Sequence, residues 1–272
     1  NDLKGDGDYD RFEDQPIENW GMQLYSGSYC RNANKIGSMV YTDADGKYTF
    51  EGLLHGGYSV KEASDPAWKN TTDMCQNIEL GYGDSEKLKF GNFELGKIEG
   101  YKYDDINQDG DWDSNEPEVA GWKITLLRYG IHQDHVYTDA NGYYSFGPLG
   151  PGLYTVIEES RLLSGWKHIN PVTGMYTMQR LESGETKRLD FGNHSFAIIK
   201  LDKDTLPGRT GEEFTLNILQ DGVEIKEHDL RDRDIPTMDS VSTRFTYSVT
   251  EDPKDGWELT DLQCRSCSGE IK

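Results

Sequence analysis

Residues 105–116 read Asp-Ile-Asn-Gln-Asp-Gly-Asp-Trp-Asp-Ser-Asn-Glu. Side chains that carry oxygen stand at positions one, three, five and nine, a glycine stands at six, and an acid closes the stretch at twelve. This spacing is typical of a loop that wraps a hard cation, because the glycine permits the sharp turn and the seventh position needs only its backbone carbonyl. We therefore predict a Ca²⁺ site whose ligands, in loop order, are Asp105, Asn107, Asp109, Asp111, Asp113 and Glu116.

The same register recurs at the start of the chain. There Gly7 takes the turn position, and the candidate ligands are Asp2, Asp6, Asp8, Asp10 and Glu13. The third position holds Lys4, whose ammonium group cannot bind a cation, so we expect weaker calcium binding by this first loop. A solvated acidic turn without an ion is the alternative for both loops, and the recurrence of the spacing argues against it.

Composition limits the possible functions. The chain has 272 residues, 30 of them glycine, and a net charge of −21 at pH 7. This charge repels nucleic acids and anionic membranes, so neither is expected as a partner. The sequence contains no apolar run of membrane-spanning length, which predicts no membrane insertion within this stretch.

A strand motif occurs three times and divides the chain. Tyr-x-Val-x-Glu stands at residues 58–62, 154–158 and 247–251, and Phe-Gly-Asn closes the first two copies at residues 90–92 and 191–193. Repeats this far apart are domains rather than solenoid units. We expect three domains. The first, residues 1–93, has a calcium loop but lacks its first strand, and the second, residues 94–194, has a calcium loop. The third, residues 195–272, has no calcium loop and is cut short at its end.

Apolar residues alternate along short segments such as 122–126 and 214–218, which predicts half-buried strands. Residues 42–50 and 138–146 each read as an Asp-Gly or Asn-Gly turn that leads into an alternating strand. About seven short strands per domain, joined by glycine-rich turns, favour a β-sandwich. The predicted fold is all-β, with three tandem Ig-like or prealbumin-like sandwiches that form a rod.

The four cysteines form two pairs along the sequence. We expect Cys30 and Cys75 to form a disulfide in an extracellular, oxidising compartment. Cys264 and Cys267 lie close together near the end of the chain. For this second pair a disulfide, a redox site and half of a zinc site all remain open.

These motifs together resemble the B-type repeats of serine-aspartate repeat adhesins and, for residues 195–272, the B-type domains of collagen adhesins. The resemblance is carried by the loop at 105–116, by Thr-Asp-x-x-Gly-x-Tyr-x-Phe at 138–146, by Gly-x-Tyr-x-Val-x-Glu at 152–158 and by Phe-Gly-Asn at 191–193. It implies calcium-stabilised β-sandwich modules on a cell surface or in a cell wall, without enzymatic activity.

Some members of this group carry a lysine–asparagine isopeptide bond that a glutamate promotes. The resemblance places Lys200 and Glu251 at two of these three positions in the third domain, with the asparagine beyond Lys272. An exposed strand lysine is the more ordinary interpretation of Lys200. In the second domain Gly100 stands where the lysine is expected, which predicts no such bond there.

Three function classes remain. The first is a non-enzymatic stalk that holds a distal part of a longer chain away from a surface, in contact with the neighbouring domains of that chain. The second is a module that binds an extracellular protein or glycan, and the third is an accessory region of an extracellular enzyme. No catalytic constellation stands out among the abundant acids, and His132 and His135 are better explained as exposed residues than as a transition-metal site. Asn70 and Asn193 match the glycosylation pattern.

Overall fold

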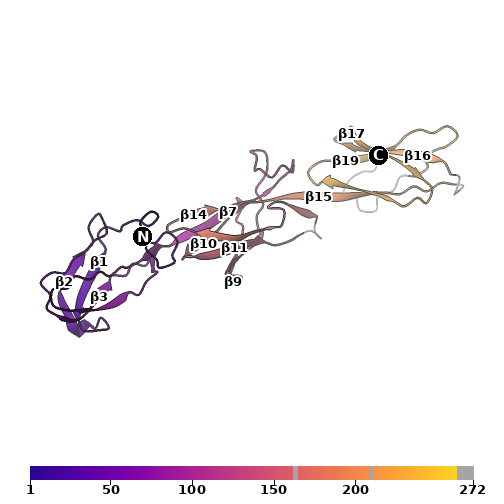
Figure 1. Ribbon diagram of the computed structural model, residues 1–272. Helices are drawn as coiled ribbons and strands as arrows, with labels where there is room; N and C mark the ends of the chain where they lie inside the picture. Colours follow the sequence, from indigo (N-terminus) through magenta and orange to yellow (C-terminus); the bar gives the residue numbers. More distant parts are fainter. Residues whose placement is uncertain (162–164, 207, 209–210, 262–272) are drawn as a thin grey trace. The chain divides into compact units, whose positions relative to one another are not determined.

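The computed structural model describes residues 1–161, 165–206, 208 and 211–261. Within these ranges the chain folds into strands and loops (Figure 1). The one helical element of the described residues is a 3-10 turn, η1 (Asn32–Asn34). The all-β prediction is therefore confirmed. Two compact units are resolved, residues 1–160 with 168–193 and residues 161–167 with 194–272. The finer division into three domains, and the rod, stay predictions.

The first part of unit 1, which contains β1 to β6, is built on an antiparallel sheet. Its strand order is β2 (Lys35–Tyr41), β1 (Gly21–Ser26), β3 (Gly56–Glu62) and β5 (Cys75–Leu80). A separate pair joins β4 (Trp68–Asn70) to β6 (Asn92–Glu94). Met22, Leu24 and Val60 form the core, with aromatic side chains packed around them. The predicted Cys30–Cys75 disulfide is present, whereas Cys264 and Cys267 lie outside the described residues.

One predicted strand of this part is not formed. The turn at Asp43 is present, since its Oδ1 accepts from the Lys47 amide at 2.8 Å and Gly46 has a φ of +69°. Residues 47–50 nevertheless have no strand conformation, unlike the equivalent residues 143–146. The latter pair with a neighbouring strand, and no such neighbour for 47–50 occurs in the described part of the chain. A strand needs that partner for its backbone hydrogen bonds.

The second part of unit 1 contains two sheets. The first has the order β10 (Tyr143–Leu149), β7 (Gly96–Asp104), β15 (Phe191–Leu201) and β12 (Trp166–Asn170), with β14 (Thr186–Arg188) also beside β7. The second has the order β13 (Met175–Leu181), β11 (Gly152–Glu158), β8 (Lys123–Arg128) and β9 (Ile131–Tyr137). Their facing residues alternate as expected, so that Ile98, Trp122, Ile124, Val156 and Phe191 are fully buried.

Unit 2 has its own sheet and core. Strand β16 (Glu213–Gln220) lies between β17 (Val223–Arg231) and β19 (Tyr247–Glu251), while β18 (Thr237–Ser242) pairs with the later part of β15. Leu201, Phe214, Leu216, Ile218 and Leu230 form the core. The sequence of the connection after β15 lacks the calcium spacing, so the absence of a calcium loop there stays a prediction.

Candidate functional site

The loop at 105–116 connects β7 to β8 and closes on itself through its own backbone. Gly110 has a φ of +89°, which favours glycine, and its amide donates to Asp105 Oδ2 at 2.9 Å. Glu116 reaches back over the loop, where its Oε1 accepts from the Ile106 amide at 2.7 Å and its Oε2 from the Asp113 amide at 3.1 Å. The first and last acids of the motif thus lie at the centre of the loop.

The other predicted ligands line the same loop. Asn107 Nδ2 donates to Asp109 Oδ2 at 2.9 Å and to Asp113 Oδ2 at 3.0 Å. The Asp111 amide donates to Asp109 Oδ1, while the Asp111 side chain is exposed. In the described part of the chain no lysine or arginine forms an ion pair with Asp109, Asp113 or Glu116. The negative charges of these three side chains are therefore not balanced by a basic partner among the described residues.

The donor set fits calcium in kind, because it consists of carboxylate and amide oxygens, two of them from the buried side chains of Asp105 and Glu116. The side chains are not arranged around an ion, however, since the described residues contain no group of three or more His, Cys, Asp or Glu side chains placed to hold a metal ion. Calcium binding therefore stays a prediction.

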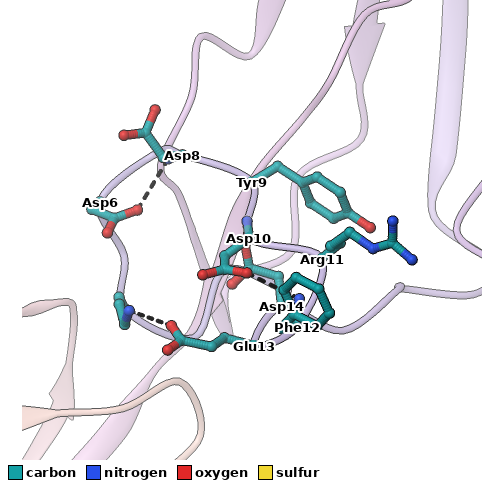
Figure 2. A pocket seen from close by; sticks show the side chains of 9 residues that line it. Asp6, Asp8, Tyr9, Asp10, Arg11, Phe12, Glu13 and Asp14 are labelled. Atoms are coloured by element: carbon teal, nitrogen blue, oxygen red, sulfur yellow. Dashed lines mark hydrogen bonds and ion pairs between the residues drawn. The ribbon is translucent and has the colours of Figure 1, made fainter.

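The first loop departs from its predicted ligand set. Asp2 is buried and accepts from the amides of Gly5 and Gly7 at 2.6 and 2.8 Å, as Asp105 accepts from Gly110. Glu13, however, forms an ion pair with Lys4 (Figure 2). Asp14 instead makes the contacts of Glu116, because it accepts from the Leu3 amide at 3.0 Å and the Asp10 amide at 2.7 Å. The structure thus places Asp14, not Glu13, at the closing position.

A second cluster of functional side chains lies inside the second part of unit 1. Lys102 on β7 and Glu158 on β11 are fully buried, with Lys102 Nζ 3.3 Å from Glu158 Oε2. Asn193 on β15, also fully buried, donates from Nδ2 to the same Oε2 at 2.9 Å. Lys102 Nζ further donates to the Phe191 carbonyl at 3.1 Å and lies 4.8 Å from the centre of the Trp122 ring. One carboxylate oxygen thus contacts both an amine and a carboxamide.

The other oxygen of Glu158 contacts a histidine. His168 on β12 has its Nδ1 2.7 Å from Glu158 Oε1, and its side chain is 13% exposed. The hydrogen bond to Glu158 raises the pKa of His168 against the effect of burial, and the charge of Lys102 lowers it. Burial lowers the pKa of Lys102 to about 8, although Glu158 opposes this shift. Both cations therefore depend on the same carboxylate.

The prediction of no isopeptide bond in the second domain rests on Gly100 and is not tested by the structure, but a lysine does lie nearby, at Lys102. Gly100 is tightly packed, since a Cβ there would lie 1.9 Å from the Leu189 carbonyl oxygen, so no lysine fits. Lys102 stands two residues further along β7 and therefore on the same face of the strand. Strand periodicity alone indicates this position, but a strand lysine is usually exposed.

In unit 2, too, the lysine that contacts the glutamate stands later in the sequence than predicted. Lys200 is exposed, in agreement with its ordinary interpretation. Lys203, three residues later, lies with its Nζ 2.6 Å from Glu251 Oε2 and 4.3 Å from the centre of the Phe214 ring. Lys203 rather than Lys200 thus faces Glu251.

Among the described residues, the first part of unit 1 repeats this cluster with two changes: no lysine pairs with its glutamate, and an asparagine stands in place of the histidine. Glu62 on β3 accepts from Asn92 Nδ2 at 2.6 Å, as Glu158 accepts from Asn193. Asn70 takes the place of His168, because each follows a strand tryptophan by two residues and Asn70 Nδ2 donates to Glu62 Oε1 at 2.6 Å. Burial raises the pKa of Glu62, and these asparagine hydrogen bonds oppose the shift.

Each loop is connected to the buried cluster of its own part by a backbone hydrogen bond. The Asp105 amide donates to the Asn193 carbonyl at 2.8 Å, and the Asp2 amide donates to the Asn92 carbonyl at the same distance. The asparagine that contacts the buried glutamate thus also holds the first acid of the loop. Because Asn193 is fully buried, its side chain is inaccessible to glycosylation in the folded protein.

His132 and His135 lie on the exposed edge strand β9, with ring centroids 6.1 Å apart. A bulge at Gln133 brings them to the same face, because Leu127 pairs with His132 and Leu126 with Asp134. The described residues provide no third His, Cys, Asp or Glu to complete a metal site with them.

The model of the SdrD B-like domain matches residues 96–168, which include the loop at 105–116, Lys102 and Glu158. These residues are therefore similar to an SdrD B-like domain. The chain is also 27% identical over 247 residues to serine-aspartate repeat-containing protein D of Staphylococcus aureus, over 82% of this chain and 18% of that protein. Protein F of the same series, from Staphylococcus epidermidis, is 28% identical over 140 residues, which cover 46% of this chain and 8% of the relative.

Solved structures give weaker matches. The Bacillus anthracis TIE protein aligns with 92% of this chain and 45% of its own, at 20% identity and a TM-score of 0.41. Two B repeat units of the collagen-binding protein of Staphylococcus aureus align with 90% of this chain and 65% of their own, at 17% identity and a TM-score of 0.26. Because these TM-scores are low, the assignment of the fold rests on the strands of this chain and not on these structures.

The chain spans less than a fifth of the serine-aspartate repeat-containing protein D that it matches. Together with the disulfide, the relatives place it outside the cell, at a cell surface or in a cell wall. None of the helical residues in the described ranges forms a segment long and apolar enough to cross a membrane.

Proposed function

We propose that this chain is a non-enzymatic stalk segment of an adhesin-like surface protein, stiffened by Ca²⁺ and by a covalent bond between Lys102 and Asn193. The observation that carries the proposal is the shared oxygen Glu158 Oε2, which lies 3.3 Å from Lys102 Nζ and accepts from Asn193 Nδ2 at 2.9 Å. A buried lysine is seldom retained for stability alone, because the desolvation of its charge opposes folding.

The position of these residues suits a protein that bears tension. β7 and β15 begin and end the second part of unit 1, and they are parallel neighbours with Lys102 in register with Phe191. A force applied to the two ends of this part pulls adjacent parallel strands past each other. A bond between Lys102 and Asn193 joins these strands and prevents the intervening residues from extending.

The bond requires no external reagent. The neutral amine of Lys102 attacks Asn193 Cγ, so that a Nζ–Cγ bond forms and the Cγ–Nδ2 bond breaks. Glu158 Oε2 takes one proton from Nζ and delivers it to Nδ2, which leaves as ammonia. The lowered pKa of Lys102 increases the fraction of neutral amine, and the side chains of Lys102 and Glu158 are fully buried.

Calcium has a separate role at the adjoining loop. An ion bound among Asp105, Asp109 and Glu116 would neutralise carboxylates that otherwise repel one another. Because the Asp105 amide is bonded to the Asn193 carbonyl, an ordered loop also supports the end of β7 beside the covalent bond. The loop that contains Asp2 occupies the same place in the first part of unit 1.

Two measurements on the full chain test the proposal. Intact-mass spectrometry of denatured protein is expected to show a mass lower by one ammonia, with Lys102 and Asn193 in one crosslinked peptide. Single-molecule stretching in calcium is expected to lack the extension of residues 102–193, and this extension should appear in Lys102→Met. An uncrosslinked chain that stretches fully in calcium contradicts the stalk mechanism.

A binding module is the second candidate. Tyr129, Ile131 and Tyr137 are 62%, 67% and 59% exposed on or beside the edge strand β9, and exposed apolar residues on such a strand favour pairing with an extracellular protein. Saturable binding to an immobilised extracellular protein that Tyr137→Ser abolishes would favour this function over a spacer. The longer chain could also be an enzyme with this segment as an accessory region, which a catalytic activity of the full-length protein would show.

A further inference from the structure

We propose that His168 makes the formation of the Lys102–Asn193 bond responsive to pH: it holds Glu158 in place and accepts the proton that Lys102 must lose before its amine attacks. The inference rests on the proposed covalent bond. His168 acts through Glu158 and does not touch the reacting carbon in this account, so it is a positioning residue rather than a catalytic one.

The geometry places His168 on the outer side of the reacting groups. Its Nδ1 lies 2.7 Å from Glu158 Oε1, while Lys102 and Asn193 contact Oε2. The His168 side chain is 13% exposed, whereas those of Lys102 and Glu158 are fully buried. A proton that moves from Lys102 through the carboxylate to His168 therefore moves toward solvent, where a positive charge is less costly.

Two cations compete for one buried carboxylate. When His168 is protonated, its positive charge pairs with the carboxylate of Glu158 and repels the ammonium group of Lys102. Both effects favour the neutral amine of Lys102. The reverse effect also holds, since the charge of Lys102 lowers the pKa of His168, which the hydrogen bond to Glu158 raises. Such coupling is reciprocal, so His168 must lower the pKa of Lys102 by the same free energy.

The remaining titratable groups around the cluster do not replace His168. Asp104 and Asp105, at the end of β7, raise the pKa of Lys102 and so favour its charged form. The hydroxyls of Tyr144 and Tyr176 have pKa values raised by burial and stay neutral in the pH range concerned. Asn193 on β15 is uncharged.

The first part of unit 1 supplies the matched substitution. Asn70 holds Glu62 Oε1 at 2.6 Å in the place where His168 holds Glu158 Oε1. An asparagine at this position therefore keeps the hydrogen bond to the glutamate but cannot accept a proton. His168→Asn thus separates the positioning of Glu158 from the titration of histidine.

The test follows crosslinking in newly made full-length chain. Wild type, His168→Asn, Glu158→Gln and the control His132→Asn are synthesised in a cell-free system and transferred to buffers from mildly acidic to mildly alkaline. Intact mass then records the loss of ammonia with time. His168→Asn should crosslink about tenfold more slowly than wild type near neutral pH and approach the wild-type rate as the pH rises above the pKa of Lys102.

The outcomes separate the two proposals. Wild type that never loses ammonia overturns both the bond and the role of His168. Wild type that crosslinks with the same pH profile as His168→Asn leaves the bond intact and overturns the role of His168. His132→Asn is expected to match wild type throughout, and Glu158→Gln to remain uncrosslinked.

A second measurement applies even if His168→Asn does not fold. In the uncrosslinkable variant Asn193→Ala, the imidazole of His168 is titrated by nuclear magnetic resonance, with and without Lys102→Met. Removal of the Lys102 charge should raise the His168 midpoint by a measurable fraction of a pH unit. An unchanged midpoint shows that the two groups are not coupled and overturns the inference.

Discussion

Lys102 and Glu158 form an ion pair at 3.3 Å in which both side chains are completely excluded from solvent. A buried ion pair loses the hydration of two charges, and replacing it with apolar residues is often neutral or stabilising. This pair is also hydrogen-bonded to a carboxamide and a histidine. Its chemistry, rather than its contribution to packing, accounts best for its place in the core.

Loss of the lysine should destabilise the protein through the loss of the covalent bond. Lys102→Met is expected to show the mass calculated from its sequence, without the loss of ammonia, and to unfold at a lower temperature than wild type. The lower stability is expected because a bond that closes a loop of about 90 residues contributes about 4–5 kcal/mol in the chain-entropy model. Differential scanning calorimetry measures this change. Lys97→Met, on the same strand but half-exposed, is the control and should leave mass and melting nearly unchanged.

An uncrosslinked lysine should make stability depend on pH in the alkaline range. In Asn193→Ala, folded Lys102 releases its proton near its lowered pKa of about 8, whereas the unfolded chain keeps it up to the ordinary 10.5. Between these values the unfolded state binds more protons, so the stability of the fold should rise with pH by roughly 2–4 kcal/mol, and below about 8 this contribution is constant. Denaturant unfolding measures the trend relative to Asn193→Ala with Lys102→Met, where the same rise would contradict the assignment.

Chelation of calcium should destabilise unit 1 and leave unit 2 nearly unaffected. If calcium is present at about a hundred times its dissociation constant, occupancy stabilises the fold by about 2.7 kcal/mol. Asp109→Ala with Glu116→Ala should reproduce the effect at the loop in the second part of unit 1, seen as a lower melting temperature and faster proteolysis at 105–116. Asp111→Asn, which keeps the backbone carbonyl, is the control. Identical melting curves in calcium and in chelator would exclude the site.

The two loops should differ in affinity and in their closing acid. Isothermal titration is expected to resolve weaker calcium binding by the loop at 2–14, because Lys4 adds a positive charge and pairs with Glu13. Asp14→Asn should weaken this loop by several-fold, since Asp14 holds the position of Glu116. Glu13→Gln should have a smaller effect. The opposite order would restore Glu13 as the ligand.

Removal of the disulfide should destabilise the first part of unit 1. Cys30 and Cys75 are 45 residues apart, and a bridge that closes such a loop contributes about 3–4 kcal/mol. Cys30→Ser with Cys75→Ser is therefore expected to lower the temperature at which this part unfolds, with Lys102–Asn193 crosslinking unchanged. An unaltered melting profile would show that the disulfide does not stabilise the fold.

Much of this protein follows from local spacing. Alternating apolar residues predict strands such as β8, the Asp-Gly and Asn-Gly pairs predict their turns, and the spacing from Asp105 to Glu116 predicts a loop that closes around its acids. These features depend on neighbours within a few residues, whose relative directions the backbone period determines. The Cys30–Cys75 pairing was indicated by the position of both cysteines in the first third of the chain.

Contacts between strands that are distant in the sequence do not follow from local spacing. That Lys102 faces inward, that Glu158 has a histidine on its second oxygen, and that Asp14 replaces Glu13 all depend on which strand or turn lies opposite. Lys102 and Asp14 stand within two residues of Gly100 and Glu13, and only packing selects between them: the close approach of Leu189 excludes a side chain at Gly100, and Glu13 is paired with Lys4. The spacing of the sequence predicts which segments form strands and loops, whereas the tertiary structure decides which charges share a buried site, because desolvation acts only once the strands have met.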